Sequence, residues 1–362
     1  MRERSEKRPC LRAATRGHTV LRRCLEAGRE AEMVLAMHAP DGFLEPPVAG
    51  ATALLAMAIL GFALRSSTNS YDDRSIPLAG VSAAFVFAAQ MVNFPVAAGT
   101  TGHLMGGALA AILLGPRMGA IVVAIVVAVQ ALLFADGGLT ALGYNTINMA
   151  IVPAFGGWAA FRGFQRLFPR SRTGVTGAAS LASGVSVVLG AMAFSLQWLF
   201  GASSPVAFDT VFGAVVGVHI LIGIGEGLIT GLVVAAVLTT RPDVVAGAAD
   251  LNPSELGSGR HVTARTFAIA GTLVALTVAM VLSQFSAGSP DGLERVAETE
   301  GLSSQAEPHP LAGSIFADYA TQGIANETAS LAIAGASGAI LTLVVGWGIA
   351  DGPRRWAART TS

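Results

Sequence analysis

Residues 211–238 read VFGAVVGVHILIGIGEGLITGLVVAAVL, an unbroken apolar stretch whose one charged residue is Glu226. A helix needs about 20 apolar residues to cross the hydrocarbon core of a bilayer. The stretch therefore predicts a membrane-spanning helix. Its glycines Gly223, Gly227 and Gly231 stand four residues apart, a spacing that lets two helices approach closely in lipid.

The composition of the whole chain is that of a membrane protein with many spans. Charged residues make up 13% and hydrophobic residues 52% of the 362 residues, whereas soluble domains carry ~25% charged residues. The formal net charge is zero, which argues against a nucleic-acid-binding protein because phosphate binding needs a basic surplus. The only lysine is Lys7 and no His-Glu-x-x-His motif occurs. The chain is therefore neither a P-loop ATPase nor a zinc protease of that type, and we expect no enzyme activity.

Further apolar runs lie at 48–64, 77–94, 102–115, 118–134, 142–161, 175–199, 266–285 and 329–349. The run 102–115 is too short to span and contains His103, so it predicts a half-helix or re-entrant segment inside the bundle. We expect an all-α integral membrane bundle of about seven membrane segments, followed by two C-terminal transmembrane helices. A polar stretch, 241–264, is interpreted as a cytoplasmic linker between a membrane domain at 37–240 and a C-terminal domain at 265–362.

The arginines predict the orientation of these spans in the cytoplasmic membrane. If the first span runs inward, thirteen arginines beyond Met37 fall in inner loops and only Arg295 falls in an outer loop, as the positive-inside rule requires. Met37 then faces outside. Residues 1–36 carry nine basic and five acidic residues, which would lie on the wrong side. We interpret 1–36 as a non-native extension caused by a start codon placed too early. The alternative is a genuine cytoplasmic arm with every span inverted.

The stretch MHAPDGFL at 37–44 contains a candidate metal chelate. If Met37 is the N-terminus, its amine, the amide nitrogen of His38 and the His38 Nδ1 can bind one ion in a plane. Planar nitrogen coordination suits Ni(II) or Cu(II). His103, an ionisable side chain at membrane depth, is the candidate fourth ligand. The alternatives are an ordinary histidine in an exposed loop for His38 and a neutral histidine bonded to a carbonyl oxygen for His103.

Several long motifs resemble the substrate-binding membrane component of cobalt and nickel energy-coupling-factor (ECF) transporters, the CbiM/NikM family. They are MHxPDGFL at 37–44, QMVNFP at 90–95, GHLxGGALAAILLGP at 102–116, LLFxDGGLTALG at 132–143 and HxLIGIGE at 219–226. PDGLE at 290–294 resembles the motif of the two-span accessory domain of these systems. The resemblance implies that Met37, His38 and His103 hold the transported ion.

Other polar residues of the predicted helices have less certain roles. Gln90, Asn93, Asn145 and Asn148 are candidates to orient the ligating imidazoles. His219 and Glu226 lie seven residues apart and so share one helix face. We favour a structural role for this pair. The alternative is a proton relay, which would make the chain a proton-coupled secondary metal-ion carrier.

The resemblance implies uptake of Co(II) or Ni(II) as the transported substrate, with no permanently bound cofactor. It also implies partners in the lipid bilayer and the cytoplasm: a transmembrane coupling (T) subunit and two ATPase subunits. The C-terminal domain, with a long acidic outer loop at about 286–328 and His309 as its one outer histidine, is expected to assist uptake without forming part of the metal site. The sequence does not choose between cobalt and nickel.

Overall fold

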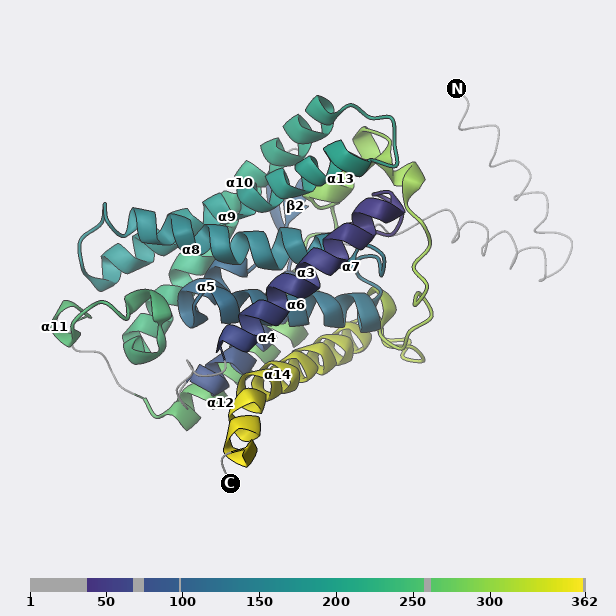
Figure 1. The fold of residues 1–362 in the computed structure, drawn as a ribbon. Coiled ribbons are helices and arrows are strands. Elements are labelled where there is room, and N and C mark those ends of the chain that lie inside the picture. The colour runs from purple at the N-terminus through teal and green to yellow at the C-terminus, as the bar shows by residue number, and fades with distance from the viewer. Residues whose placement is uncertain (1–37, 68–74, 98, 257–261, 361–362) are drawn as a thin grey trace, which may run out of the picture. The chain divides into compact units, whose positions relative to one another are not determined.

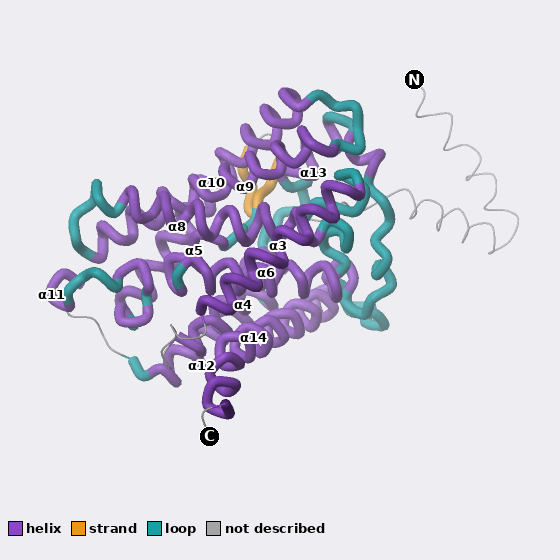
Figure 2. The backbone as a smooth tube through the Cα atoms, viewed as in Figure 1, coloured by secondary structure: helices purple, strands orange, loops and turns teal. Residues whose placement is uncertain are grey.

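The structure is a computed structural model that describes residues 38–67, 75–97, 99–256 and 262–360. The predictions made for residues 1–36 and for Met37 lie outside the described residues. All the described residues belong to one compact unit. Helices dominate it, and one short β-hairpin lies among them (Figure 2).

Six helices among the described residues are long and apolar enough to cross a membrane. They are α3 (Pro46–Ser67), α6 (Pro116–Val129) with its π-helical continuation Gln130–Phe134, α9 (Arg172–Gly201), α10 (Phe208–Thr240), α12 (Ala264–Met280) with the 3-10 turn Leu282–Phe285, and α14 (Glu327–Thr360). Each coincides with an apolar run of the sequence, and the expected class of helical membrane protein is confirmed.

Shorter helices account for the three remaining apolar runs. They are α4 (Ser75–Gln90), α5 (Gly107–Leu114), and α7 (Leu142–Asn145) joined through the π-helical segment Thr146–Ile151 to α8 (Val152–Phe164). All eight residues of α5 are buried. The run 102–115 is therefore a half-helix surrounded by protein, where irregular backbone next to it is tolerated.

One short hairpin, which the sequence did not predict, lies between α4 and α5 of this helical fold. β1 (Phe94–Ala97) pairs antiparallel with β2 (Thr100–Gly102), so the chain leaves α4 at Gln90 and turns back before α5 begins. Gly99 in the turn has φ +74, a conformation that glycine adopts without steric cost. The hairpin delivers His103 to the N-terminal side of α5.

Glycine allows the close packing of α9 against α10. A Cβ atom added at Gly223 would lie 2.8 Å from the carbonyl oxygen of Gly184, and one at Gly227 would lie 2.6 Å from that of Ser180. Contacts this short exclude any side chain, so the four-residue glycine spacing serves helix packing as expected.

The C-terminal helices are not a separate body. Both α12 and α14 pack along α4 (Figure 1). A Cβ atom at Gly80 of α4 would lie 2.8 Å from the Leu343 carbonyl oxygen of α14. The chain after the linker is thus built onto the same bundle that carries His38 and His103.

The segment between α10 and α12 docks at one end of the bundle. It contains the 3-10 turns Pro242–Val244 and Ala246–Ala248 and the helix α11 (Pro253–Leu256). Arg162 pairs with Asp250 at 2.5 Å, and Arg170 Nε donates to Glu255 Oε1 at 2.8 Å. The helix α13 (Gly292–Thr299) lies at the opposite end (Figure 1).

Candidate metal centre

The N-terminal loop folds back into the bundle through the carboxylate of Asp41. This carboxylate accepts hydrogen bonds from Leu139 N at 3.1 Å, from Thr140 N at 2.6 Å and from Thr140 Oγ1 at 2.5 Å. Gly42, with φ +88, makes the turn that follows. These contacts connect the 38–44 loop to the 136–140 loop.

Two more contacts fix the loop beside His38. The main-chain oxygen of Ala39 accepts from Asn145 Nδ2 at 2.9 Å and from Gly138 N at 3.1 Å. Tyr144 donates its hydroxyl to the oxygen of Pro40 at 2.8 Å. As a result His38 is only 2% exposed, and the interpretation of an exposed-loop histidine is wrong.

We predict that Asp41→Asn will weaken metal binding by about tenfold. Asp41 holds the loop that carries His38, and groups that orient a metal ligand typically contribute 10- to 100-fold to affinity. The amide would place an NH₂ group against one of the N–H or O–H donors that the carboxylate now satisfies. Isothermal titration with Ni²⁺ would measure the change. Asp209→Asn, a change of the same type at the start of α10 outside the site, is the matched control. Equal affinities for the two variants would show that the contacts of Asp41 do not matter for binding.

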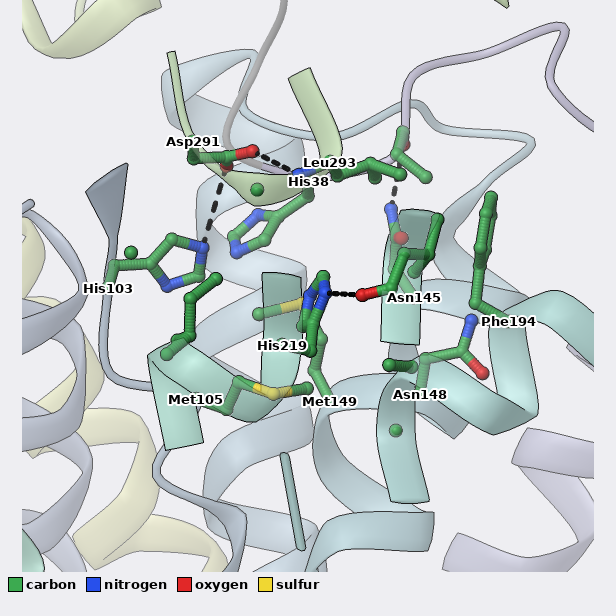
Figure 3. Close-up of a pocket in the computed structure, with 17 residues that line it drawn as sticks. His38, His103, Met105, Asn145, Asn148, Met149, Phe194, His219, Asp291 and Leu293 are labelled. Carbon is green, nitrogen blue, oxygen red and sulfur yellow. Dashed lines mark hydrogen bonds and ion pairs between the residues drawn. The ribbon is translucent and has the colours of Figure 1, made fainter. Parts of the chain in front are cut away.

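The imidazoles of His38 and His103 face each other at the end of the bundle. Their ring centroids are 5.6 Å apart and their planes are nearly perpendicular, at 83°. Figure 3 shows the two rings side by side, one from the N-terminal loop and one from the segment between β2 and α5. Residues separated by 65 positions in the sequence are thus brought together, as the proposed metal site requires.

Asp136 is the carboxylate partner of His38. Its Oδ1 lies 3.3 Å from His38 Nδ1. Burial alone would lower the pKa of His38, but the charge and hydrogen bonding of Asp136 outweigh it and raise that pKa above its ordinary value. Burial alone would likewise raise the pKa of Asp136, and His38 reverses this effect, so the carboxyl stays ionised to lower pH than usual.

Asp291 places a carboxylate beside His103, with Oδ2 3.8 Å from His103 Nε2. Its other oxygen caps α13 by accepting from the main-chain nitrogens of Leu293 and Glu294, both at 2.8 Å. Burial raises the pKa of Asp291 above its usual range. The position of the carboxylate is set by Thr101 of β2, whose N–H donates to the oxygen of Pro290 at 2.9 Å.

Part of the C-terminal domain lies beside the candidate metal site. The domain was expected to assist uptake without forming part of the site, and Asp291, Gly292 and Leu293 line the same pocket as the two histidines (Figure 3). The physical reason is the pairing of the PDGLE stretch with the edge of the hairpin at Thr101.

Three of the other candidate polar residues line this pocket: Asn145, Asn148 and His219. Asn148 exchanges two hydrogen bonds of 2.9 Å with the side chain of Gln197. His219 Nδ1 lies 2.7 Å from the oxygen of Val215 in its own helix.

Gln90 and Glu226 lie outside the pocket lining and hold the segment that follows His103. Glu226 accepts from Met105 N at 2.6 Å and from Gly106 N at 3.2 Å. Gln90 donates to the oxygen of Met105 at 3.0 Å. Both the N–H and the oxygen of Met105 are therefore hydrogen-bonded to side chains of two helices. The carboxylate of Glu226 is hydrogen-bonded to main-chain amides and not to His219.

Asn93 lies at the joint between the hairpin and the C-terminal part of the chain. Its main-chain N–H donates to Ser286 Oγ at 2.8 Å, and its main-chain oxygen accepts from Ala287 N at 2.9 Å. It is not among the residues that line the pocket, and its contacts connect two segments of the backbone.

Within the described part of the chain, no group of three or more His, Cys, Asp and Glu side chains is arranged to hold a metal ion. The side chains of His38 and His103 alone offer two nitrogens. In the ligand set expected from the sequence, the further donors are the amide nitrogen of His38 and the amine of the residue before it, which lies outside the described residues.

The sequence did not identify Asp136 and Asp291 as residues of the site. Both lie within motifs that carry the resemblance, 132–143 and 290–294, but neither was predicted as a residue of the site. Their presence inside family motifs was the available signal.

Long apolar helices that enclose buried ionisable side chains define a helical integral membrane protein in which those side chains mark a candidate ion or substrate site. The chain belongs to one family of this class: the model of the cobalt uptake substrate-specific transmembrane region matches residues 38–244. A model of the PDGLE domain matches residues 265–353.

Similar proteins include members with nickel and with cobalt in their names. A protein of Archaeoglobus fulgidus, whose name describes a fused nickel transport protein NikMN, is 34% identical over 86% of this chain and 98% of its own length. The cobalt transport protein CbiM of Geobacter sulfurreducens is 30% identical over 67% and 72% of the two chains. The crystal structure of a truncated transition metal transporter is 30% identical and covers 56% of this chain and 98% of its own, with a TM-score of 0.49.

As a member of this family, the chain is a multi-pass membrane protein for cobalt/nickel uptake, a substrate-binding component of the ECF type. It is a transport protein and not an enzyme.

Proposed function

We propose that the chain captures Co(II) or Ni(II) from the outer side of the cytoplasmic membrane at the His38–His103 pair, and releases the ion inward when partner subunits hydrolyse ATP. The observation that supports this proposal is the buried pair itself, with ring centroids 5.6 Å apart and a carboxylate beside each ring. Surface histidines of no function would be solvated and would not be packed against each other in this way.

The charges around the pair suit a divalent cation. Moving a dication out of water is costly unless charged or polar groups replace its hydration shell. Asp136 and Asp291 are both buried, at 4% and 3% exposure. Two carboxylates beside the imidazoles lower the cost of placing a doubly charged ion there, because opposite charges attract strongly in a medium of low dielectric constant.

The ligand set that we propose is the amine of Met37, the amide nitrogen and Nδ1 of His38, and the imidazole of His103. It requires that translation begin at Met37, so that residues 1–36 are absent from the working protein. In the structure His38 Nδ1 faces Asp136. Coordination through this nitrogen exchanges the contact with Asp136 for one with the metal.

We further propose that α4, α5 and the α7–α8 segment are membrane segments together with the long helices, which gives seven segments in a domain at 37–240. The two helices of the PDGLE domain follow at 265–362, after the linker at 241–264. The metal site, the hairpin and α13 then lie at the outer face, and the docked linker lies at the cytoplasmic face with its arginines, as the positive-inside rule favours.

This orientation predicts the outcome of reporter fusions. Fusions after Arg172 and after Arg260 should have cytoplasmic activity, and fusions near Asp209 and near Glu307 should have external activity, because inner loops carry thirteen arginines and outer loops carry one. Alkaline phosphatase and a cytoplasmic fluorescent protein report the two sides. The reverse pattern would show that every span has the opposite orientation, and it would support the alternative that residues 1–36 are a genuine cytoplasmic arm.

Uptake measurements test the transport proposal. Cells that express the chain together with a T subunit and two ATPase subunits should accumulate radioactive Ni²⁺ or Co²⁺, and an inactive ATPase variant should abolish accumulation. Uptake that continues without ATP would instead support a proton-coupled carrier. The structure does not favour that alternative, because the carboxylate of Glu226 is bonded to Met105, Gly106 and Ser183.

A further inference from the structure

Tyr319 reaches the metal centre from the C-terminal part of the chain. Its hydroxyl donates to Asp136 Oδ2 at 2.6 Å, and the other oxygen of the same carboxylate lies 3.3 Å from His38 Nδ1. We propose that Tyr319 is a positioning residue of the metal centre: in the metal-free protein it fixes the Asp136 carboxylate, which holds the His38 imidazole beside His103 until the ion replaces Asp136 at His38 Nδ1. The inference rests on the proposed function, because it takes His38 as a ligand of the transported ion.

The ring of Tyr319 is held by aromatic neighbours. Its centroid lies 5.0 Å from that of Phe134 and 6.2 Å from that of Phe87. Phe316, three residues earlier, stacks against Phe134, with ring centroids 5.7 Å apart and an interplanar angle of 17°. Gln130 Nε2 donates to the Tyr319 oxygen at 3.0 Å, so the hydroxyl hydrogen is directed to Asp136.

The backbone at Tyr319 is strained. Asp318 and Tyr319 have φ values of +53 and +56, in the left-handed region that bulky side chains rarely adopt. Backbone of this kind persists only where the surroundings enforce it, and it is concentrated at functional sites. Here the strained pair turns the Tyr319 side chain inward to Asp136.

The loop around Tyr319 does not depend on the tyrosine hydroxyl for its attachment. Ser314 Oγ donates to the oxygen of Leu133 at 2.8 Å, and Thr321 N donates to Ser330 Oγ at 2.6 Å. Removing the hydroxyl alone therefore leaves the loop in place, and its effect on the metal centre is separable from an effect on docking.

The test is a Ni²⁺ titration of the purified full-length protein with its natural N-terminus, in wild type and in Tyr319→Phe. We expect about tenfold weaker binding for Tyr319→Phe, the lower end of the usual effect of a group that orients a ligand. Ser314→Ala is the matched control, since it removes one hydroxyl hydrogen bond between the same two segments without touching Asp136. It should bind as wild type does.

A double-mutant cycle with Asp136→Asn separates positioning from packing. If Tyr319 acts through Asp136, the double variant should bind Ni²⁺ as weakly as Asp136→Asn alone. The visible absorption band of bound Ni(II), which reports ligand geometry, should shift in Tyr319→Phe and not in Ser314→Ala.

Two results would overturn the inference: wild-type affinity and spectrum in Tyr319→Phe, or losses that add fully in the double variant. His38→Ala distinguishes this failure from failure of the proposed function. If His38→Ala abolishes binding while Tyr319→Phe has no effect, only the role of Tyr319 is refuted. If His38→Ala binds as wild type does, the proposed metal centre itself is wrong.

Discussion

One residue added in front of Met37 is expected to weaken Ni(II) binding by at least about 100-fold, as much as His38→Ala does. Loss of a ligand should exceed the 10- to 100-fold effect of groups that merely orient ligands. The proposed chelate uses the amine of Met37 and the amide of His38, and a preceding residue converts that amine into a peptide nitrogen. Titration of protein that begins at Met37, beside the extended protein, measures the difference.

Two further variants make this experiment decisive. His103→Ala should leave the three nitrogens of the terminus and weaken binding less than the extension does. His309→Ala is the matched control, because this histidine lies outside the pocket lining and its Nδ1 accepts from Leu311 N at 3.0 Å. Equal affinity of the extended and unextended proteins would remove the amine from the ligand set, and the metal site would then no longer require that residues 1–36 be absent.

The long helices could be predicted because length and hydropathy are local properties. The apolar run 211–238 lies within α10, and the short run 102–115 contains the eight-residue α5. A bilayer restricts the chain so strongly that a run of sufficient length has few alternatives to a spanning helix. The pairing of His38 with His103 was predicted from the candidate chelate at 37–38 and from the ionisable side chain of His103 at membrane depth, and the family resemblance implies the same pair. The structure places their rings side by side.

The carboxylates of the site could not be predicted in the same way. Asp291 reaches His103 because residues 290–291 pair with Thr101, a contact across about 190 positions of the sequence. The hairpin that makes this edge lies between the apolar runs 77–94 and 102–115, where the sequence did not predict strands. Periodicity and composition describe one segment at a time, so they do not indicate which loops meet at the end of a bundle.

Glu226→Ala is expected to reduce the free energy of unfolding by about 3 kcal/mol or more. The carboxylate accepts from Met105 N, Gly106 N and Ser183 Oγ, and each buried donor left without an acceptor costs about 1–3 kcal/mol. Because the first two donors follow His103, Ni²⁺ affinity should fall as well, by about tenfold. Thermal denaturation in detergent and Ni²⁺ titration measure the two effects.

Two variants on the same helix show whether the carboxylate itself is responsible. Glu226→Gln should lose part of the stability, since its amide oxygen can accept one hydrogen bond while its NH₂ group meets another donor. Thr230→Ala, one turn further along α10, removes a hydroxyl that contacts Ser183 Oγ at 2.8 Å and should cost less than about 1.5 kcal/mol, the upper range for one hydrogen bond. If Glu226→Ala unfolds at the same temperature as Thr230→Ala, the amides after His103 have other acceptors. Glu226 would then be available for the proton relay that its bonds to Met105 and Gly106 otherwise exclude.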